Sequence, residues 1–261
     1  IYNNHGIIGL INTPTARFYD EGVHGVTVYD GTPDQKITLS SNPYDWLEAS
    51  FFYTNVQGFP YPNYEYQDYK DKGFNVKVRL KKQGIFPAIA VGLNDFAGTG
   101  FYSSEYIVSS YGIDNFDIHF GLGFGQLNGT KDNIKNPFGY INNSFKDRPV
   151  DYEGLGGTFN PSKYFSGETA TPFYGISYLL TNNILLKVEK DTTLVDSPGI
   201  RSDSDTRLRY KDRKSDYSFG VDYLINDNFS LGTSYERGGF FSLKLIYKND
   251  PIRKIKKYEY Q

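Results

Sequence analysis

The chain has 261 residues with 28 basic and 30 acidic side chains, and its net charge of -2 gives no electrostatic reason to expect nucleic acid as a partner. It contains no cysteine, which excludes disulfides, thiolate metal sites and thiol nucleophiles. The 24 Tyr, 20 Phe and 27 Gly are typical of β structure, and no apolar run approaches the ~20 residues of a transmembrane helix.

The N-terminal residues 1–24 have no regular period, and we expect an irregular segment that is a candidate luminal or periplasmic plug. Thr13-Pro14-Thr15 breaks its short apolar run at residues 7–11. Residues 25–248 are expected to form one β domain, and residues 249–261 form a polar C-terminal tail with a basic middle.

Alternation of apolar and polar side chains predicts antiparallel strands through most of the remaining chain. The expected strands are residues 25–29, 36–40, 46–53, 74–81, 86–94, 101–110, 116–126, 173–180, 184–189, 217–225, 229–236 and 240–248. A helix over residues 177–190 is the alternative to a hairpin there, but Asn182-Asn183 and the flanking strand patterns favour the hairpin.

The predicted connections alternate between long and short from Tyr53 onward. Residues 58–72, 127–172 and 190–216 read as long loops, with a strand extension at 206–211, whereas residues 83–85 and 181–183 read as tight turns. Outer-membrane barrels have short turns at one end and long loops at the other, and a soluble Greek-key sandwich has no reason to sort its loops in this way. The sequence therefore favours a single up-and-down antiparallel transmembrane β-barrel of about 12 strands.

Charged residues share one face of the expected strands, and the apolar residues lie on the other. In a barrel these charges would line the lumen, where they can pair, whereas in a soluble sandwich they would face water. The expected luminal residues are Glu48, Lys77, Arg79, Lys81, Glu105, Asp117, His119, Lys187, Glu189, Asp222, Glu236 and Lys244. A structural charge network is the simpler interpretation of this set, and a polar conduit or saccharide-binding lumen is the functional alternative.

Other patterns give weaker indications. Tyrosines and phenylalanines at strand ends suit an interfacial girdle, or sugar stacking in a soluble protein. The girdle candidates are Tyr53, Phe101, Tyr102, Phe173, Tyr223, Tyr235 and Tyr247. The three histidines are scattered without metal-ligand spacing, and we expect neither a metal nor a cofactor. No GxSxG sequence is present, and the glycines at 121, 123 and 125 are best explained as small inner-face residues that let a loop or plug approach the wall.

Four ordered motifs resemble those of the YjbH/GfcD-like family. Residues 9–17, GLINTPTAR, are similar to the opening motif of the family, with Thr13, Pro14 and Arg17. Residues 69–74, YKDKGF, resemble the segment before a strand, with Lys70 and Asp71. Residues 87–110 resemble the next block, which includes Asp95, Ser103, Ser104 and Glu105, and FGLGFGQL at 120–127 is similar to the strand that follows.

This resemblance implies a bacterial outer-membrane barrel linked to exopolysaccharide or capsule export. The implied partners are outer-membrane lipid, polysaccharide and periplasmic export proteins, and no enzymatic activity is implied. Typical members are longer and have a second barrel-like half, so this chain is expected to be one barrel, a short member or a fragment. Thr13, Pro14 and Arg17 are expected near the periplasmic entrance, with folding inside the barrel as the alternative, and Asp95 and Ser103–Glu105 are expected in the outer half of the lumen. The alternatives are a general diffusion porin, a structural barrel, or a soluble carbohydrate-binding protein or enzyme.

Overall fold

The computed structural model describes all residues except 33, 62–63, 99, 150–159, 195–212 and 252–261, and of residues 58–61 and 64–66 it describes the backbone alone. The strands are β1 His24–Asp30, β2 Asp34–Tyr44, β3 Leu47–Tyr61, β4 Tyr64–Lys81, β5 Ala88–Asn94, β6 Ser104–Ile113, β7 Phe116–Gly125, β8 Ile134–Lys135, β9 Thr169–Thr181, β10 Ile184–Lys190, β11 Tyr217–Leu224, β12 Phe229–Glu236 and β13 Phe240–Asn249. Three short 3-10 helices, η1 Pro137–Tyr140, η2 Asn143–Phe145 and η3 Pro161–Lys163, lie between β7 and β9. Within these described parts no helix is long and apolar enough to cross a bilayer.

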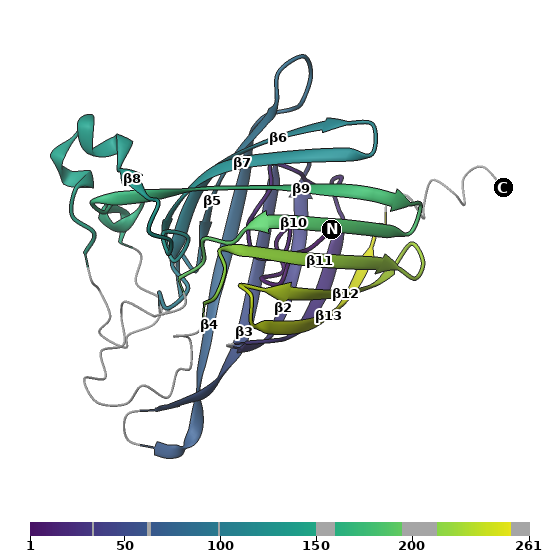
Figure 1. Cartoon of the computed structure of the whole chain (residues 1–261), viewed down its shortest axis with the longest axis horizontal. Coiled ribbons are helices and arrows are strands. Elements are labelled where there is room, and N and C mark those ends of the chain that lie inside the picture. Colours follow the sequence, from purple (N-terminus) through teal and green to yellow (C-terminus); the bar gives the residue numbers. More distant parts are fainter. Residues whose placement is uncertain (33, 62–63, 99, 150–159, 195–212, 252–261) are drawn as a thin grey trace.

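The sheet closes on itself. Each strand from β1 to β6 pairs with the next in antiparallel register, β7 pairs with β9, each strand from β9 to β12 pairs with the next, and β13 returns to pair with β1. The short strand β8 pairs only with the edge of β9, outside this ring. Among the described residues the wall is thus a closed antiparallel barrel of twelve strands (Figure 1), which confirms the predicted fold.

The two faces of the wall differ in the way that a barrel in lipid requires. On β2, Ile37 and Leu39 are about half exposed, whereas Lys36, Thr38 and Ser40 between them are buried inside the barrel. The same alternation runs along β11, β12 and β13. Apolar side chains that face outward would contact acyl chains, and ionic side chains that face inward are paired away from lipid.

Two predictions about the outline of the strands have different outcomes. Residues 169–190 form the hairpin of β9 and β10, so the preference for a hairpin over a helix is confirmed. The prediction of a loop at 58–72 is wrong, because β3 runs to Tyr61 and β4 begins at Tyr64. The hairpin of β3 and β4 extends well past the neighbouring strands at the bottom of Figure 1. The strand extension expected at 206–211 and most of the tail lie outside the described residues.

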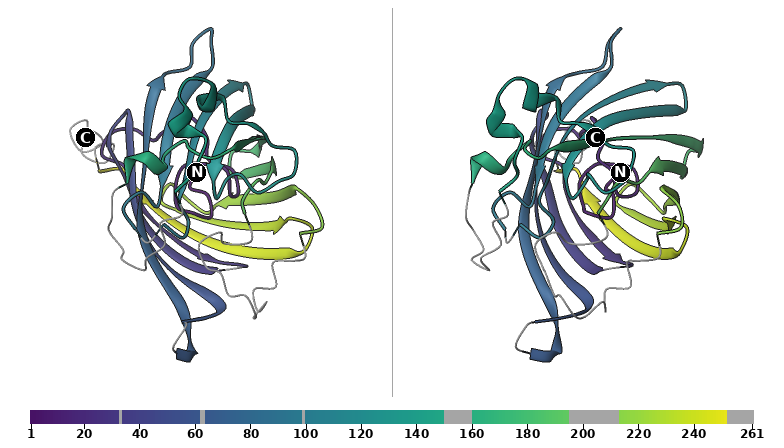
Figure 2. Two further views of the ribbon diagram at one scale, coloured as in Figure 1. Left: turned by 90° about the vertical axis from the view of Figure 1, so that its left-hand side faces the viewer. Right: turned by 60° about the vertical axis from the view of Figure 1, so that its left-hand side comes forward.

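The N-terminal residues 1–22 do not join the sheet. They fold back on themselves through two isolated bridges, Tyr2 with Ile8 and Gly9 with Pro14. The N-terminal chain is drawn within the ring of strands in both views of Figure 2. Nearly all of its side chains up to Ala16 are buried.

Candidate functional site: a lumen filled by the N-terminal segment

Glu189, near the outer end of β10, binds the backbone of the N-terminal segment. Its carboxylate accepts hydrogen bonds from the backbone N–H groups of Ile11, Asn12 and Thr13 at 3.0, 2.7 and 3.1 Å. The Thr13 hydroxyl donates a fourth at 2.7 Å. A buried carboxylate is costly unless hydrogen bonds satisfy it. Here groups on the segment supply all four of the bonds recorded for it in the described structure.

A second acidic residue holds the same segment from β3. Oε1 of Glu48 accepts the N–H of Ile8 at 2.6 Å, and Oε2 lies 2.6 Å from Nζ of Lys77 on β4. Lys77 in turn donates to the carbonyl oxygens of Ile8 and Arg17 at 3.1 and 2.9 Å. This buried ion pair therefore satisfies both N–H and carbonyl groups of the irregular N-terminal backbone. Backbone groups that are enclosed away from water need such hydrogen-bond partners.

The opposite wall repeats this arrangement. Lys187 on β10 donates to the carbonyl oxygen of Leu10 at 2.8 Å, and its Nζ lies 2.5 Å from Oδ2 of Asp222 on β11. Lys244 on β13 lies 3.1 Å from the other oxygen of Asp222. The two lysines share one buried carboxylate, and the segment backbone provides a further acceptor for Lys187.

The side chains of two asparagines reach the outer end of the lumen. The Asn4 and Asn12 amides donate to Glu236 on β12 at 2.8 and 2.7 Å, and Asn12 also donates to Asp191 at 2.8 Å. Arg237 lies 3.5 Å from Asp191 and 3.3 Å from Glu236. The segment therefore reaches the end of the barrel at which the long connections emerge.

Arg17 marks the other end of the segment. Its guanidinium forms a forked contact with Asp117, at the start of β7, with distances of 2.7 and 2.6 Å. It also donates to Gln83 in the β4–β5 turn at 2.6 Å. These contacts place Arg17 at the short-turn end of the barrel, whereas Thr13 lies inside it, near the outer end of β10.

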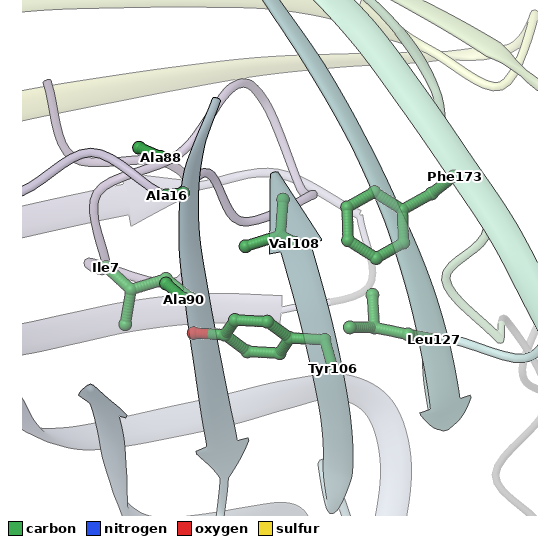
Figure 3. Packing of buried hydrophobic residues seen from close by; sticks show 8 residues of the cluster. All are labelled: Ile7, Ala16, Ala88, Ala90, Tyr106, Val108, Leu127 and Phe173. Atoms are coloured by element: carbon green, nitrogen blue, oxygen red, sulfur yellow. The ribbon is translucent and has the colours of Figure 1, made fainter. Parts of the chain in front are cut away.

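Apolar contacts complete the packing of the segment. Figure 3 shows Ile7 and Ala16 against Ala88 and Ala90 of β5 and Tyr106 of β6, in a buried cluster that also holds Val108, Leu127 and Phe173. Glycines in the wall make room for larger side chains: a Cβ atom at Gly175 would lie 2.4 Å from Leu10, and one at Gly220 would lie 3.0 Å from Ile11. The segment is packed against the wall like a protein core.

The glycines singled out in the sequence serve a different neighbour. A Cβ atom at Gly121 would lie 2.2 Å from the ring of Phe173 on the adjacent strand β9, and one at Gly123 would lie 2.5 Å from Leu127. Phe173 is fully buried inside the barrel, so its assignment to the outer girdle is wrong. Phe101 is also buried, and Tyr102 donates to Asp34 at 2.6 Å. Tyr53, Tyr223 and Tyr235 are exposed on the outside, as a girdle needs.

The expected luminal residue Glu105 lies on the other side of the wall. Its register partners are Leu93 and Phe124, which belong to the outward face. The connection between β7 and β9 covers it there: Arg148 forms a forked contact with Glu105 at 2.7 and 2.8 Å, and the N–H of Phe165 donates to it at 3.0 Å. Phe124 packs against Phe138 and Phe165 of the same connection. The prediction of a luminal Glu105 is therefore wrong. This residue faces outward and binds the connection between β7 and β9 at the outer rim of the barrel.

The remaining predicted residues divide by position. Arg79 lies inside, 3.6 Å from Asp45 and beside the ring of Phe18, whereas Lys81 is exposed and lies over Phe86 at the short-turn end.

Lys70 is exposed and Asp71 is buried on the projecting part of β4. Asp95 and Ser104 lie at the outer ends of β5 and β6, and Ser103 lies 3.3 Å from Arg148. Pro14 is buried within the segment.

A small chamber remains between the segment and the outer end. Its lining is His5 and Asn12 of the segment with Lys36, Phe52, Asn75, Asn94, Tyr102, Ser104, Gln126, Leu127 and Thr193. Lys36 lies 3.2 Å from Asp34 and 4.0 Å from the centre of the Tyr102 ring. A second, smaller space lies between Ile11 of the segment and Gly220 and Lys244 of the wall. In the described structure the segment occupies the lumen from Arg17 at the short-turn end to Asn12 at the outer end.

No pattern in the sequence indicates a paired serine and histidine, but the structure brings one together. The Ser110 hydroxyl lies 2.7 Å from Nδ1 of His119, and Nε2 of His119 lies 3.8 Å from Asp117. Ser110 also accepts the N–H of Ala16, and both Ser110 and His119 are about 1–2% exposed. The segment covers this hydroxyl, so no substrate can approach it in this arrangement. No group of metal-ligating side chains occurs in the part of the chain that the structure describes.

The family and sequence comparisons agree with each other. A family model described as "Exopolysaccharide biosynthesis protein YbjH" matches residues 1–259. The "Uncharacterized lipoprotein YjbH" of Escherichia coli K12 is 33% identical over 245 residues, which cover 92% of this chain and 34% of that protein. The chain thus spans about a third of the length of this relative.

Solved structures that match include outer-membrane β-barrels of low sequence identity. The NanC porin has a TM-score of 0.43 at 8% identity and is covered over 100% of its length and 88% of this chain. The KdgM porin, solved with disordered oligogalacturonate, has a TM-score of 0.43 at 7% identity over 87% of this chain and 98% of that chain. The outer membrane phospholipase A from Escherichia coli has a TM-score of 0.34 at 7% identity, and the match covers 88% of this chain and 93% of that chain.

Proposed function

This chain belongs to the YjbH family of exopolysaccharide biosynthesis proteins, and we propose that it is an outer-membrane barrel that assists exopolysaccharide export rather than a general diffusion porin. Its filled lumen carries this choice. Glu48, Glu189 and Glu236 all bind residues of the N-terminal segment from different parts of the wall. A diffusion porin needs an aqueous channel, whereas this interior is occupied along its length.

The proposed location is the bacterial outer membrane, with lipid as the immediate partner of the wall. The exposed apolar side chains of β2 and β13 support this location, because Leu39, Leu243 and Leu245 are each about half exposed between buried polar neighbours. Such a surface is stable when acyl chains cover it. Polysaccharide and periplasmic export proteins are the further partners that we propose.

We also propose that the role is not enzymatic. The Ser110–His119 pair is the arrangement in the described chain that comes nearest to a catalytic pair, and Ala16 covers it. A nucleophile must be within reach of a substrate, which this hydroxyl is not. The barrel therefore acts through its surfaces, as a support or anchor of the export machinery.

The export role can be tested in the source bacterium. We expect that deletion of the gene lowers the amount of exopolysaccharide outside the cell, and that the full-length gene restores it. A matched experiment measures the uptake of small sugars into liposomes that contain the purified barrel, for which we expect no increase over empty liposomes. Unchanged polysaccharide export would contradict the proposed role, and free sugar uptake would favour the porin alternative.

A further inference from the structure

We infer that residues 1–17 are a displaceable plug, and that the barrel forms a transmembrane path for water and small ions when this plug leaves the lumen. This inference goes beyond the proposed function, because a barrel that assists export could remain closed at all times. It depends on how the segment is held, how it is connected, and what remains when it is absent.

The wall holds the plug with a residue that has no other hydrogen-bond partner in the described structure. Glu189 is fully buried, and the bonds recorded for its carboxylate come from Ile11, Asn12 and Thr13. Glu48, by contrast, binds Ile8 of the plug and is also paired with Lys77 of the wall. Glu189 therefore contributes to binding of the plug, whereas Glu48 also neutralises a charge within the wall itself.

The plug can leave without breaking the barrel. Its own bridges join Tyr2 to Ile8 and Gly9 to Pro14, and every ladder of the closed ring is formed between strands β1 to β13. The connection to β1 is a single turn in which Asp20 and Glu21 are exposed and Gly22 has a φ of 85°. Removal of the plug thus costs none of these pairings, and on the side of β1 it needs movement at one exposed turn.

The contacts of the plug also explain why the closed state dominates. Ile7, Ile8, Leu10 and Ile11 are at most 3% exposed, and displacement would transfer these side chains to water. The polar contacts have a different consequence, because water can replace the plug as the partner of Lys77, Lys187 and Glu189. The barrel is therefore closed at rest and remains a wettable path when the plug is out.

Planar bilayer recordings in KCl test the inference on the whole chain. We expect wild-type protein to be closed almost all of the time, and Glu189→Ala to raise the open probability by about tenfold or more, since three buried N–H groups lose their acceptor. The matched control is Lys190→Gln. Lys190 is the next residue of β10 but lies on the outward face, over the ring of Tyr174, and it bonds to Asp132 and Pro172 rather than to the plug, so this variant should stay closed.

A disulfide separates plug displacement from general damage to the barrel. A Cβ atom at Gly220 would lie 3.0 Å from Cγ1 of Ile11, so cysteines at these two positions would have Cβ atoms about 3.5–4.5 Å apart, as a disulfide requires. The chain has no other cysteine. In the Glu189→Ala background, the oxidised Ile11→Cys/Gly220→Cys variant should be closed, and reduction should restore the openings.

Two outcomes would overturn the inference. If folded Glu189→Ala, identified by its heat-dependent migration in gels, remains as closed as wild type, Glu189 does not retain the plug. If the oxidised cross-link leaves the openings unchanged, ions take another route. An independent measurement is the rate at which a membrane-impermeant thiol reagent labels Ile11→Cys. This rate should rise in the Glu189→Ala background and stay low in the Lys190→Gln background.

Discussion

Nζ of Lys77 lies 2.6 Å from Oε2 of Glu48, and the two residues face each other across β3 and β4 with side chains that are 1% exposed. The pair lies inside the barrel, while Phe74 on the same strand is exposed on the outside. Because side chains alternate along a strand, this pair shows which face of β3 and β4 points into the barrel. It also links the wall to the plug, because each partner binds the backbone of Ile8.

Removal of one member of this pair should be strongly destabilising. Lys77→Met leaves the buried Glu48 carboxylate without its cation and removes two donors to the plug, and we expect a loss of about 3–5 kcal/mol in the free energy of unfolding. The Glu48→Gln/Lys77→Met double variant should lose less than the sum of the single variants. Chemical denaturation in lipid vesicles measures these differences. The control is Lys81→Met, an exposed cation on the same strand, with an expected change of less than about 0.5 kcal/mol.

The outward face should report direct contact with lipid. Leu39 lies in the middle of β2 and is 52% exposed, so Leu39→Arg should lower the free energy of unfolding in a bilayer by about 2–4 kcal/mol. Leu39→Trp in a Trp46→Phe background gives a single fluorophore, and lipids brominated deep in the acyl chains should quench it. The native Trp46, in the turn after β2, should be quenched best by shallow bromines. If Leu39→Trp is not quenched by any brominated lipid, the wall does not face the bilayer.

The wall could be predicted from the sequence because its signal is local. Side chains on a strand alternate with a period of two, so Phe116, Ile118 and Phe120 fall on one face whatever their partners are. The sorted connection lengths then favoured an up-and-down barrel. Even the wrong loop at 58–72 follows from the same logic, because its prolines and aspartate are typical of turns, whereas pairing between β3 and β4 continues through most of it.

The contents of the lumen could not be predicted, because they depend on contacts between distant residues. Glu189 meets Thr13 across 176 positions, and nothing in either neighbourhood signals the other. Glu105 was assigned to the wrong face because Ser104 and Ile107 interrupt the alternation of β6. Arg148, its partner, lies in a stretch without a period, so its role emerged only from the folded connection.

The clasp between Arg148 and Glu105 should hold the β7–β9 connection against the rim. Besides the forked ion pair, Arg148 donates to the carbonyl oxygens of Lys163 and Ser166 at 3.2 and 3.4 Å. We expect Arg148→Ala to raise the rate at which an added protease cleaves this connection by about tenfold, since several charge-assisted hydrogen bonds are lost. Lys146→Ala, an exposed cation nearby, should leave the rate unchanged. Equal cleavage of both variants would show that the aromatic contacts alone retain the connection.

The connection after β5 should become less stable as pH rises. Burial raises the pKa of Asp95 well above its usual value, and the neighbouring Asp71 carboxylate raises it further. Two weaker effects lower this pKa: the N–H of Tyr102 donates to Asp95 at 3.0 Å, and Lys163 and Lys36 lie nearby. The folded state therefore binds the Asp95 proton more tightly than the unfolded state does.

The sign of the effect follows from this difference in proton affinity. The stabilisation is fully present below the pKa of about 4 that an unfolded aspartate has, and it is lost as pH rises toward the raised pKa of the folded state. Asp95→Asn keeps the shape of the protonated carboxyl and should remove this dependence. Hydrogen exchange of the amides at 96–103, compared between the variant and wild type at each pH, measures it. Wild-type protection relative to Asp95→Asn should fall with pH, and a constant ratio would show that Asp95 does not hold its proton in the folded rim.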